Sequence, residues 1–181
     1  MPVWVSLLRG VNLGARNKVN MPKLRVALED AGFEAVRTYV QSGNVVTKSR
    51  HRSPEKVGER VRSVVADTFG LDVPVVVRSP AELRALVDWN PFPDDAAARP
   101  TAVHLIHLAE EPRADRVDAV TATDYSPDEL AVRGREVALC YAETMHRSRL
   151  QHGAVLKKLG VDGTARNWRT LQALVEMTSS D

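Results

Sequence analysis

The chain has 181 residues, of which 44% are hydrophobic and 27% charged, enough apolar material for one domain or two small ones. It has no run of about eighteen apolar residues, and its opening MPVWVSLLRG is too short and too soon charged for a signal peptide. We therefore expect a cytoplasmic protein without a membrane partner. The single cysteine, Cys140, excludes an internal disulfide and a cysteine-based metal centre.

The net charge is only +2, but it is distributed unevenly. Residues 1–62 hold 12 Lys and Arg against 5 Asp and Glu, whereas residues 80–130 hold 4 against 11. The basic ends could form one positive face that attracts phosphates or nucleic acid. The same pattern is equally typical of solvated helix faces of opposite sign, so both interpretations stay open.

The first 79 residues predict six elements in the order βαββαβ. They are a strand at Val3–Leu8, a helix between Asn20 and Gly32, strands at Ala35–Val40 and Asn44–Thr47, a helix from Pro54 to Phe69, and a strand at Val73–Val77. Ser42-Gly43 predicts a tight hairpin between the second and third strands. This split βαβ order favours an antiparallel sheet with helices on one face and Val3–Leu8 in its centre, beside Ala35–Val40 and Val73–Val77.

The second half repeats this pattern less clearly. Ser79-Pro80-Ala81-Glu82 is a capping box, and Asn90-Pro91-Phe92-Pro93 predicts a loop after the helix. Further along, we expect a strand at Ala102–Leu108, a helix at Arg113–Val120, a hairpin of Glu129–Arg133 and Glu136–Tyr141, and two closing helices, the last at Thr164–Met177. The fold class is therefore α+β with two consecutive βαββαβ-type subdomains, at residues 1–79 and 80–181.

A glycine-bearing loop between the first strand and helix is the best candidate for a binding site. Its cationic and amide side chains are Arg9, Asn12, Arg16, Asn17 and Lys18. Such donors, with backbone amides freed by glycines and a nearby helix N-terminus, are the parts of anion sites. The loop is neither a Walker A loop nor GxGxxG. The alternative is that its glycines and Asn12 are needed for left-handed turns and that its cations are merely solvated.

The segment SLLRGVNLGARNKVNMPKLRVALEDAGFEAVRTYVQSGNVV closely resembles the opening of the uncharacterised bacterial family DUF1697. Arg147-Ser148-Arg149-Leu150 resembles that family's Ser-Lys-Leu-type segment, with Arg149 in place of lysine, and Thr164-Ala165-Arg166-Asn167-Trp168 resembles its closing Arg-Asn-Trp motif. The resemblance implies ferredoxin-like α+β subdomains. It implies no activity, substrate or catalytic residue.

The closing motif is the second candidate for binding. If Thr164 is an N-cap, Arg166 lies in the first helical turn, where a cation opposes the helix dipole, and a bound phosphate or carboxylate would relieve that conflict. Alternatively, Arg166 pairs with an acidic residue while Asn167 helps to cap the helix. We predict that this helix N-terminus and the loop line one concave surface, with Arg9, Lys18, Arg149 and Arg166 facing a common anion.

Other reactive residue types favour structural roles. Ser42 belongs to a hairpin turn and has no base placed beside it by spacing. His104 and His107 lie three apart on a strand, so they point to opposite faces and cannot bind one metal ion. Cys140, between Leu139 and Tyr141, is typical of a small buried side chain. We predict no metal site and no cofactor.

Two functional hypotheses remain. The preferred one is a protein that binds a phosphate-bearing small molecule or nucleic acid through Arg9, Asn12, Arg16, Asn17, Lys18, Arg147, Arg149, Arg166 and Asn167. Only 5% of the residues are aromatic, which disfavours a single-strand stacking platform. The alternative is an enzyme acting on a small phosphorylated or carboxylated metabolite, in which Tyr39, Ser42 or His146 would transfer protons. The oligomeric state is not predicted.

Overall fold

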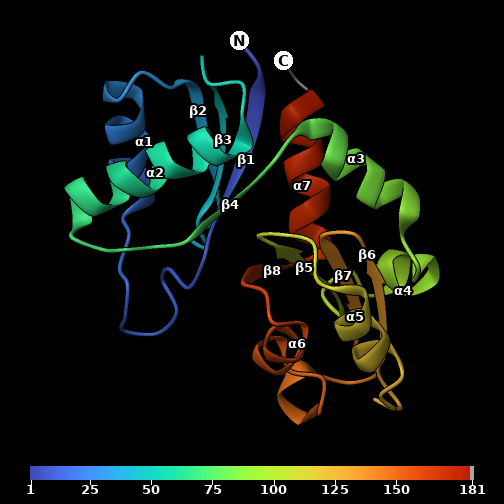
Figure 1. Ribbon diagram of the computed structural model, residues 1–181. Coiled ribbons are helices and arrows are strands. Elements are labelled where there is room, and N and C mark those ends of the chain that lie inside the picture. The colour runs from blue at the N-terminus through green and yellow to red at the C-terminus, as the bar shows by residue number, and fades with distance from the viewer. Residues whose placement is uncertain (180–181) are drawn as a thin grey trace. The chain divides into compact units, whose positions relative to one another are not determined.

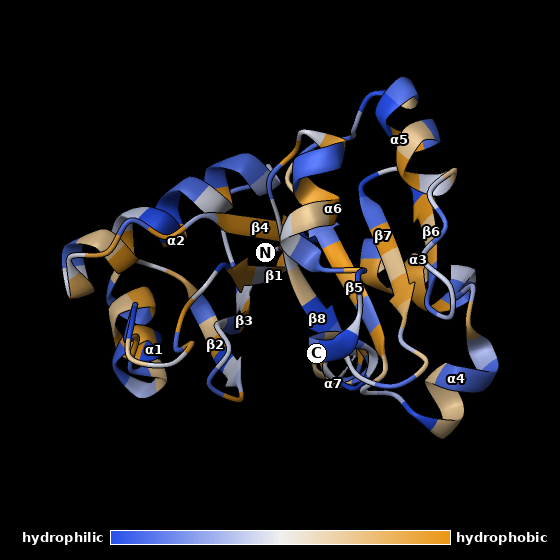
Figure 2. Cartoon of the chain, turned by 90° about the horizontal axis from the view of Figure 1, so that it is seen from below, coloured by the Kyte–Doolittle hydropathy of each residue, from blue (hydrophilic) through white to orange (hydrophobic). Residues whose placement is uncertain are grey.

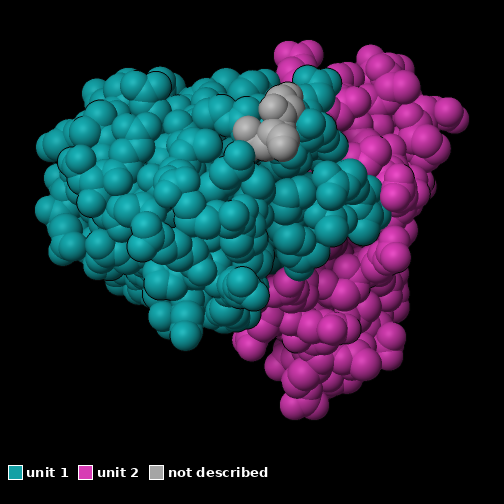
Figure 3. Space-filling view, turned by 90° about the horizontal axis from the view of Figure 1, so that it is seen from above, with its two compact units in different colours: residues 1–85, 173–181 teal, residues 86–172 magenta. Residues whose placement is uncertain are grey.

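A computed structural model describes residues 1–179 as an α+β protein with two four-stranded antiparallel sheets (Figure 1). The chain forms two compact units. The first unit comprises Met1–Ala85 and the segment that begins at Ala173, and the second comprises Leu86–Gln172 (Figure 3). The sequence-based boundary at residue 79 precedes α3 (Pro80–Trp89), whereas the division between the compact units falls within that helix.

The first unit contains the six expected elements: β1 (Val3–Leu8), α1 (Met21–Asp30), β2 (Glu34–Tyr39), β3 (Asn44–Lys48), α2 (Pro54–Phe69) and β4 (Val75–Arg78). Its strand order is β2-β3-β1-β4. The central position of β1 is confirmed, but the prediction that it lies beside Ala35–Val40 is wrong, because β1 pairs with β3 and β4. The physical reason is burial: four of the five β3 residues are buried, as an interior strand requires, whereas only one of the six β2 residues is buried, and β2 takes the edge.

The second unit follows the same order after two helices. Its elements are the end of α3, α4 (Pro93–Ala98), β5 (Val103–Leu108), α5 (Ala114–Thr121), β6 (Glu129–Arg133), β7 (Glu136–Cys140), the short 3₁₀ helix η1 (Met145–Arg147), α6 (His152–Leu159), β8 (Gly163–Asn167) and the start of α7 (Trp168–Ser179). The strand order is β6-β7-β5-β8. Two predictions are wrong here, since a helix begins at Pro93 within the expected loop and Thr164 lies in a strand. Residue Thr164 pairs with His107, and this pairing completes the sheet beside β5.

The two units share the same strand order, and some of their backbone hydrogen bonds also correspond. The Leu8 amide donates to the Gly43 carbonyl at 2.8 Å, and the Leu108 amide donates to the Arg135 carbonyl at 2.9 Å. In each unit, the last residue of the first strand, β1 or β5, thus donates a hydrogen bond to the turn of the neighbouring hairpin. The same correspondence places an arginine on the fourth strand of each unit, as described below.

Each sheet has its own helical cover. In the first unit, α1 and α2 pack together over β1, β2 and β4, and their buried side chains include Leu24, Leu28, Val57, Val61 and Val65. In the second unit, α5 and α6 contribute Val120, Val155 and Leu159 to the core. Figure 2 shows hydrophobic colouring on β4 and β7 and hydrophilic colouring along much of α2. No helix within residues 1–179 is both long enough and apolar enough to cross a membrane.

Candidate functional site

The loop after β1 owes its shape to left-handed backbone held by asparagine side chains. Gly10, Asn12, Gly14 and Asn17 have φ angles of 65°, 55°, 59° and 47°. The Asn12 side chain accepts a hydrogen bond from the Val19 amide at 2.9 Å and donates to the Val19 carbonyl at 2.8 Å. The Asn17 side chain donates to the Gly10 carbonyl at 3.2 Å. The two asparagines of this loop that were predicted to bind a ligand therefore hold the loop itself in place.

The turn between β2 and β3 adjoins this loop. Asn12 Nδ2 also donates to the Gln41 carbonyl at 2.7 Å. Gly43 has φ +78°, and a Cβ atom there would lie 2.6 Å from Val11 Cγ2 and 2.7 Å from Leu8 Cβ. Only glycine permits so close an approach. Residues 9–18 and 40–43 thus form one feature, which we call the loop–turn surface.

The loop–turn surface exposes cations beside apolar side chains. Arg16 and Lys18 are exposed, and neither has an ion-pair or hydrogen-bond partner within the described chain. Leu13 is 70% exposed. Val40 is 52% exposed and has φ +48°, an unfavourable conformation for a β-branched residue. No carboxylate occurs between residues 9 and 20. The surface can therefore attract an anion without competition from its own loop.

Arg147 and Arg149 lie in and just after η1, in the second unit. Arg147 Nη1 lies 3.6 Å from Glu143 Oε2, and both side chains are largely exposed. Arg149 is exposed, and its charge contributes to a lowered pKa of Asp124, whose main cause is the hydrogen bond from Ser126. The hydroxyl of Ser148 between them donates to Asp128. Carboxylates therefore already surround this segment.

Arg166 is a buried strand residue, and its predicted place in the first turn of a helix is wrong. It lies on β8 opposite Leu105 and is 8% exposed. Its Nη1 donates to Thr164 Oγ1 and to the Ala165 carbonyl, both at 2.8 Å. Burial lowers the pKa of Arg166 to about 10. A conflict with the helix dipole does not arise.

Asn167 is the last residue of β8 and caps the N-terminus of α7. Its side-chain oxygen accepts a hydrogen bond from the Thr170 amide at 3.0 Å, which satisfies one of the free amides of the first turn. The capping role predicted as an alternative for Asn167 is confirmed. Trp168, Leu171 and Leu174 are buried, as expected for the core side of this helix.

The structure also contains an arginine that the sequence analysis did not single out. Arg78 lies on β4 opposite Val5 and is 1% exposed. Its register corresponds to that of Arg166 on β8, since each arginine faces the residue three positions before the end of its central strand. Because the two units repeat the same strand order, a comparison of their fourth strands in the sequence could have identified Arg78. Buried arginine is thus part of the plan of both units.

The predicted common anion site joins residues of different units. Arg9 and Lys18 belong to the first unit, while Arg149 and Arg166 belong to the second. The part of that prediction that relied on a helix N-terminus at Thr164 is wrong, and the convergence of the four side chains stays a prediction. Within the first unit, the structure does bring the loop and the β2–β3 turn together.

A pair of histidines in the second unit was missed. His104 Nδ1 lies 3.0 Å from His152 Nε2, and His104 Nε2 lies 3.0 Å from the Thr101 carbonyl. The carbonyl requires a proton on His104 Nε2, so His104 Nδ1 accepts from His152. Burial lowers the pKa of His104, and burial together with His104 lowers the pKa of His152 to about 4. Both rings are therefore neutral near pH 7. No group of three or more metal-ligating side chains occurs within residues 1–179.

His107 and Cys140 are both buried, and their contacts indicate structural roles. His107 is 1% exposed and its Nδ1 lies 2.8 Å from Glu136 Oε2. Cys140 is a buried free cysteine, as predicted. Burial, followed by the charge of Asp95, raises the pKa of its thiol to about 11. Such a thiol stays protonated at neutral pH and is a poor nucleophile.

Comparisons with known proteins agree with the fold and leave the chemistry open. A family described as "Protein of unknown function (DUF1697)" matches residues 1–137. The segments at residues 147–150 and 164–168, which also resemble that family, lie outside the matched range. No curated protein matches the chain.

One similar structure is described as that of the conserved bacterial protein SP0830 from Streptococcus pneumoniae. It is 21% identical to this chain, covers 98% of both chains and has a TM-score of 0.75. At that identity the likeness concerns the fold alone. Since the family match covers most of the chain and includes the whole loop–turn surface, this protein belongs to the DUF1697 family.

Proposed function

We propose that the loop–turn surface binds a phosphate-bearing ligand. The observation that carries the proposal is the concentration of left-handed backbone at Gly10, Asn12, Gly14 and Asn17 beside two cations that have no partner within residues 1–179. Backbone of this kind turns successive amides toward one side and is used for anion binding in many proteins. Arg16 and Lys18 supply the charge, and a guanidinium and an ammonium are the usual partners of phosphate.

Pre-organisation supports binding over mere solvation of the loop. Asn12 makes three side-chain hydrogen bonds, two to Val19 and one to Gln41. These bonds hold the loop against the turn before any ligand arrives, so less conformational entropy is lost on binding. Exposed Leu13 and Val40 lie on the same surface and would contact the apolar part of a ligand.

The ligand is either a small phosphorylated molecule or nucleic acid, and salt dependence distinguishes them. A nucleic acid that meets several cations releases several counterions, so its affinity falls steeply with salt. A single phosphate group gives a shallow dependence. Pyrophosphate and a short oligonucleotide are therefore suitable probes, each titrated at two salt concentrations.

The test compares two double variants of equal charge. Arg16→Gln with Lys18→Gln should weaken binding of the probe by roughly tenfold or more, as expected from the loss of charge-assisted hydrogen bonds. Arg25→Gln with Arg84→Gln removes the same charge from exposed positions on α1 and α3, outside the loop–turn surface, and should change the affinity by less than about twofold, because exposed charges that do not contact the ligand are screened. Equal effects of the two double variants would refute the proposal.

We also propose that both units have a ferredoxin-like topology. Each unit runs βαββαβ and has its first strand between its third and fourth strands. This order supports a ferredoxin-like description of both units.

A further inference from the structure

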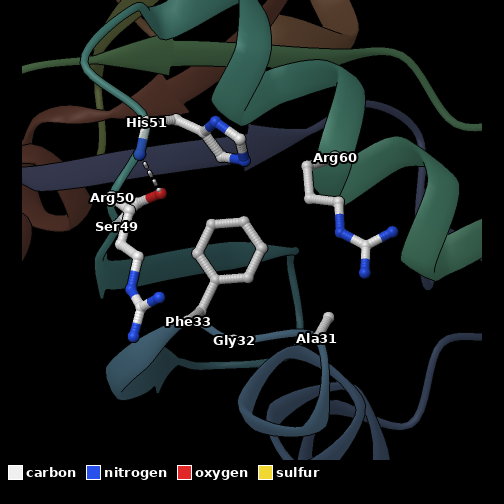
Figure 4. A pocket seen from close by; sticks show the side chains of 7 residues that line it. All are labelled: Ala31, Gly32, Phe33, Ser49, Arg50, His51 and Arg60. Atoms are coloured by element: carbon white, nitrogen blue, oxygen red, sulfur yellow. Dashed lines mark hydrogen bonds between the residues drawn. The ribbon is translucent and has the colours of Figure 1, made fainter.

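A pocket lies at the other end of the first sheet from the loop–turn surface. It is formed where α1 leads into β2, where the chain leaves β3, and by one residue of α2 (Figure 4). Its volume is about 290 Å³, and its lining residues are Ala31, Gly32, Phe33, Ser49, Arg50, His51 and Arg60. The loop–turn surface, by contrast, follows β1 and joins β2 to β3. The two features share no residue.

Both walls of the pocket have a fixed backbone. On one wall, the Ser49 amide donates to the Pro2 carbonyl, and the Trp4 indole donates to the His51 carbonyl, each at 3.1 Å. The His51 amide donates to Ser49 Oγ at 3.1 Å. On the other wall, the Phe33 amide donates to the Leu28 carbonyl at 3.0 Å. The pocket is therefore formed without a ligand.

The charge of the pocket is one-sided. Arg50 and Arg60 are exposed at its rim, and neither has a hydrogen-bond or ion-pair partner within residues 1–179. Arg62, only two residues from Arg60, shows the contrast, because its Nε and Nη2 donate to Asp72 at 2.5 and 2.7 Å. No carboxylate lines the pocket. Two arginines and His51 thus line a pocket whose lining contains no carboxylate.

The floor of the pocket is aromatic. The side chain of Phe33 lies among the three basic residues in Figure 4, and 4% of the residue is exposed. Phe33 belongs to the hydrophobic core of the first unit, so it offers the pocket a small apolar area. Guanidinium forks match the oxygens of a phosphate. The volume is at the small end of the range for ligand pockets, which favours a ligand with one phosphate and a small organic group.

We propose that this pocket binds a small phosphorylated molecule no larger than a nucleoside monophosphate. Arg50 and Arg60 bind the phosphate, His51 donates a hydrogen bond to it, and the apolar side of the pocket at Ala31 and Phe33 contacts the rest of the ligand. The inference is independent of the loop–turn surface, since different residues and a different end of the sheet carry it.

The test uses amide chemical shifts of the full chain titrated with adenosine monophosphate, with inorganic phosphate as the second probe. We expect saturable shifts at Gly32, Arg50 and His51. The double variant Arg50→Gln with Arg60→Gln should weaken binding by roughly tenfold or more, while Arg16→Gln with Lys18→Gln leaves these shifts unchanged. Unchanged thermal unfolding of each variant confirms that the fold is kept.

Other outcomes separate the two proposals. Shifts confined to residues 10–18 would overturn the pocket proposal and support the loop–turn surface. Shifts at neither place would overturn both. Binding of inorganic phosphate as tight as that of adenosine monophosphate would overturn the assignment of a contact beyond the phosphate.

Discussion

Replacing Gly43 by alanine tests how the loop–turn surface is held together. Gly43 lies in the turn before β3, and its carbonyl accepts a hydrogen bond from the Leu8 amide at 2.8 Å. An alanine Cβ would lie 2.6 Å from Val11 Cγ2 and 2.7 Å from Leu8 Cβ. Contacts under 3.0 Å force atoms apart, so the turn or the segment at residues 8–11 must move.

The expected loss of stability has two parts. Placing alanine at φ +78° costs about 1–2 kcal/mol, because left-handed backbone brings Cβ close to the carbonyl oxygen. Overpacking against Val11 and Leu8 adds about 1–3 kcal/mol. The free energy of unfolding should therefore fall by about 2–5 kcal/mol.

Gly134→Ala is the matched control. Gly134 occupies the corresponding turn between β6 and β7 and has φ +55°, but a Cβ there meets no atom within 4 Å. Its substitution by alanine should lower the free energy of unfolding only by the cost of the left-handed backbone, about 1–2 kcal/mol. Urea unfolding followed by circular dichroism gives both free energies, and hydrogen exchange of the Leu8 amide gives a local readout. Equal losses in the two variants, or full protection of Leu8 in Gly43→Ala, would refute the reasoning.

Three further predictions concern the second unit. Cys140 should react slowly with a thiol reagent in the folded protein and quickly after denaturation, because burial raises the pKa of its thiol to about 11, and rapid stoichiometric labelling of the folded protein would contradict this. Folding lowers the pKa of His104 and of His152, the latter to about 4, so below about pH 6.5 the unfolded chain binds more protons and stability falls as the pH drops toward 4. His104→Phe with His152→Phe should show a smaller loss of unfolding free energy over that interval, and an equal pH dependence would count against the assignment. Tyr141→Phe should lower the unfolding free energy by about 0.5–1.5 kcal/mol, since the buried hydroxyl donates to the Leu150 carbonyl at 2.8 Å, and unchanged chemical denaturation would argue against that bond.

Local signals in the sequence determined most of the elements. Asn20 accepts a hydrogen bond from the Lys23 amide at 2.8 Å, and Ser79 and Glu82 form the expected capping box, with the Ser79 amide 2.7 Å from Glu82 Oε2. These interactions join residues three apart, so they are present in the sequence pattern itself. The family resemblance of the first segment is likewise a property of the sequence, and the matched range confirms it.

The predicted binding loop was partly determined by the sequence. Its position after β1 and its left-handed turns at Gly10, Asn12 and Gly14 follow from residue type. The hydrogen bond from Asn12 to Gln41, 29 residues away, does not follow from residue type. The sequence identified the hydrogen-bond donors, but only the fold determined that the Asn12 side chain donates to the protein backbone.

Contacts between distant residues were decided by the tertiary structure. A strand has no local signal for its neighbour, so the pairing of β1 with β3 and the conversion of Thr164–Asn167 into β8 depend on which sheet edge is open. His104 and His152 are 48 residues apart, and the pocket around Phe33 combines three separate segments. Short-range hydrogen bonds and periodicity are encoded within a few residues, whereas burial and pairing arise only when the whole chain excludes water from a common core.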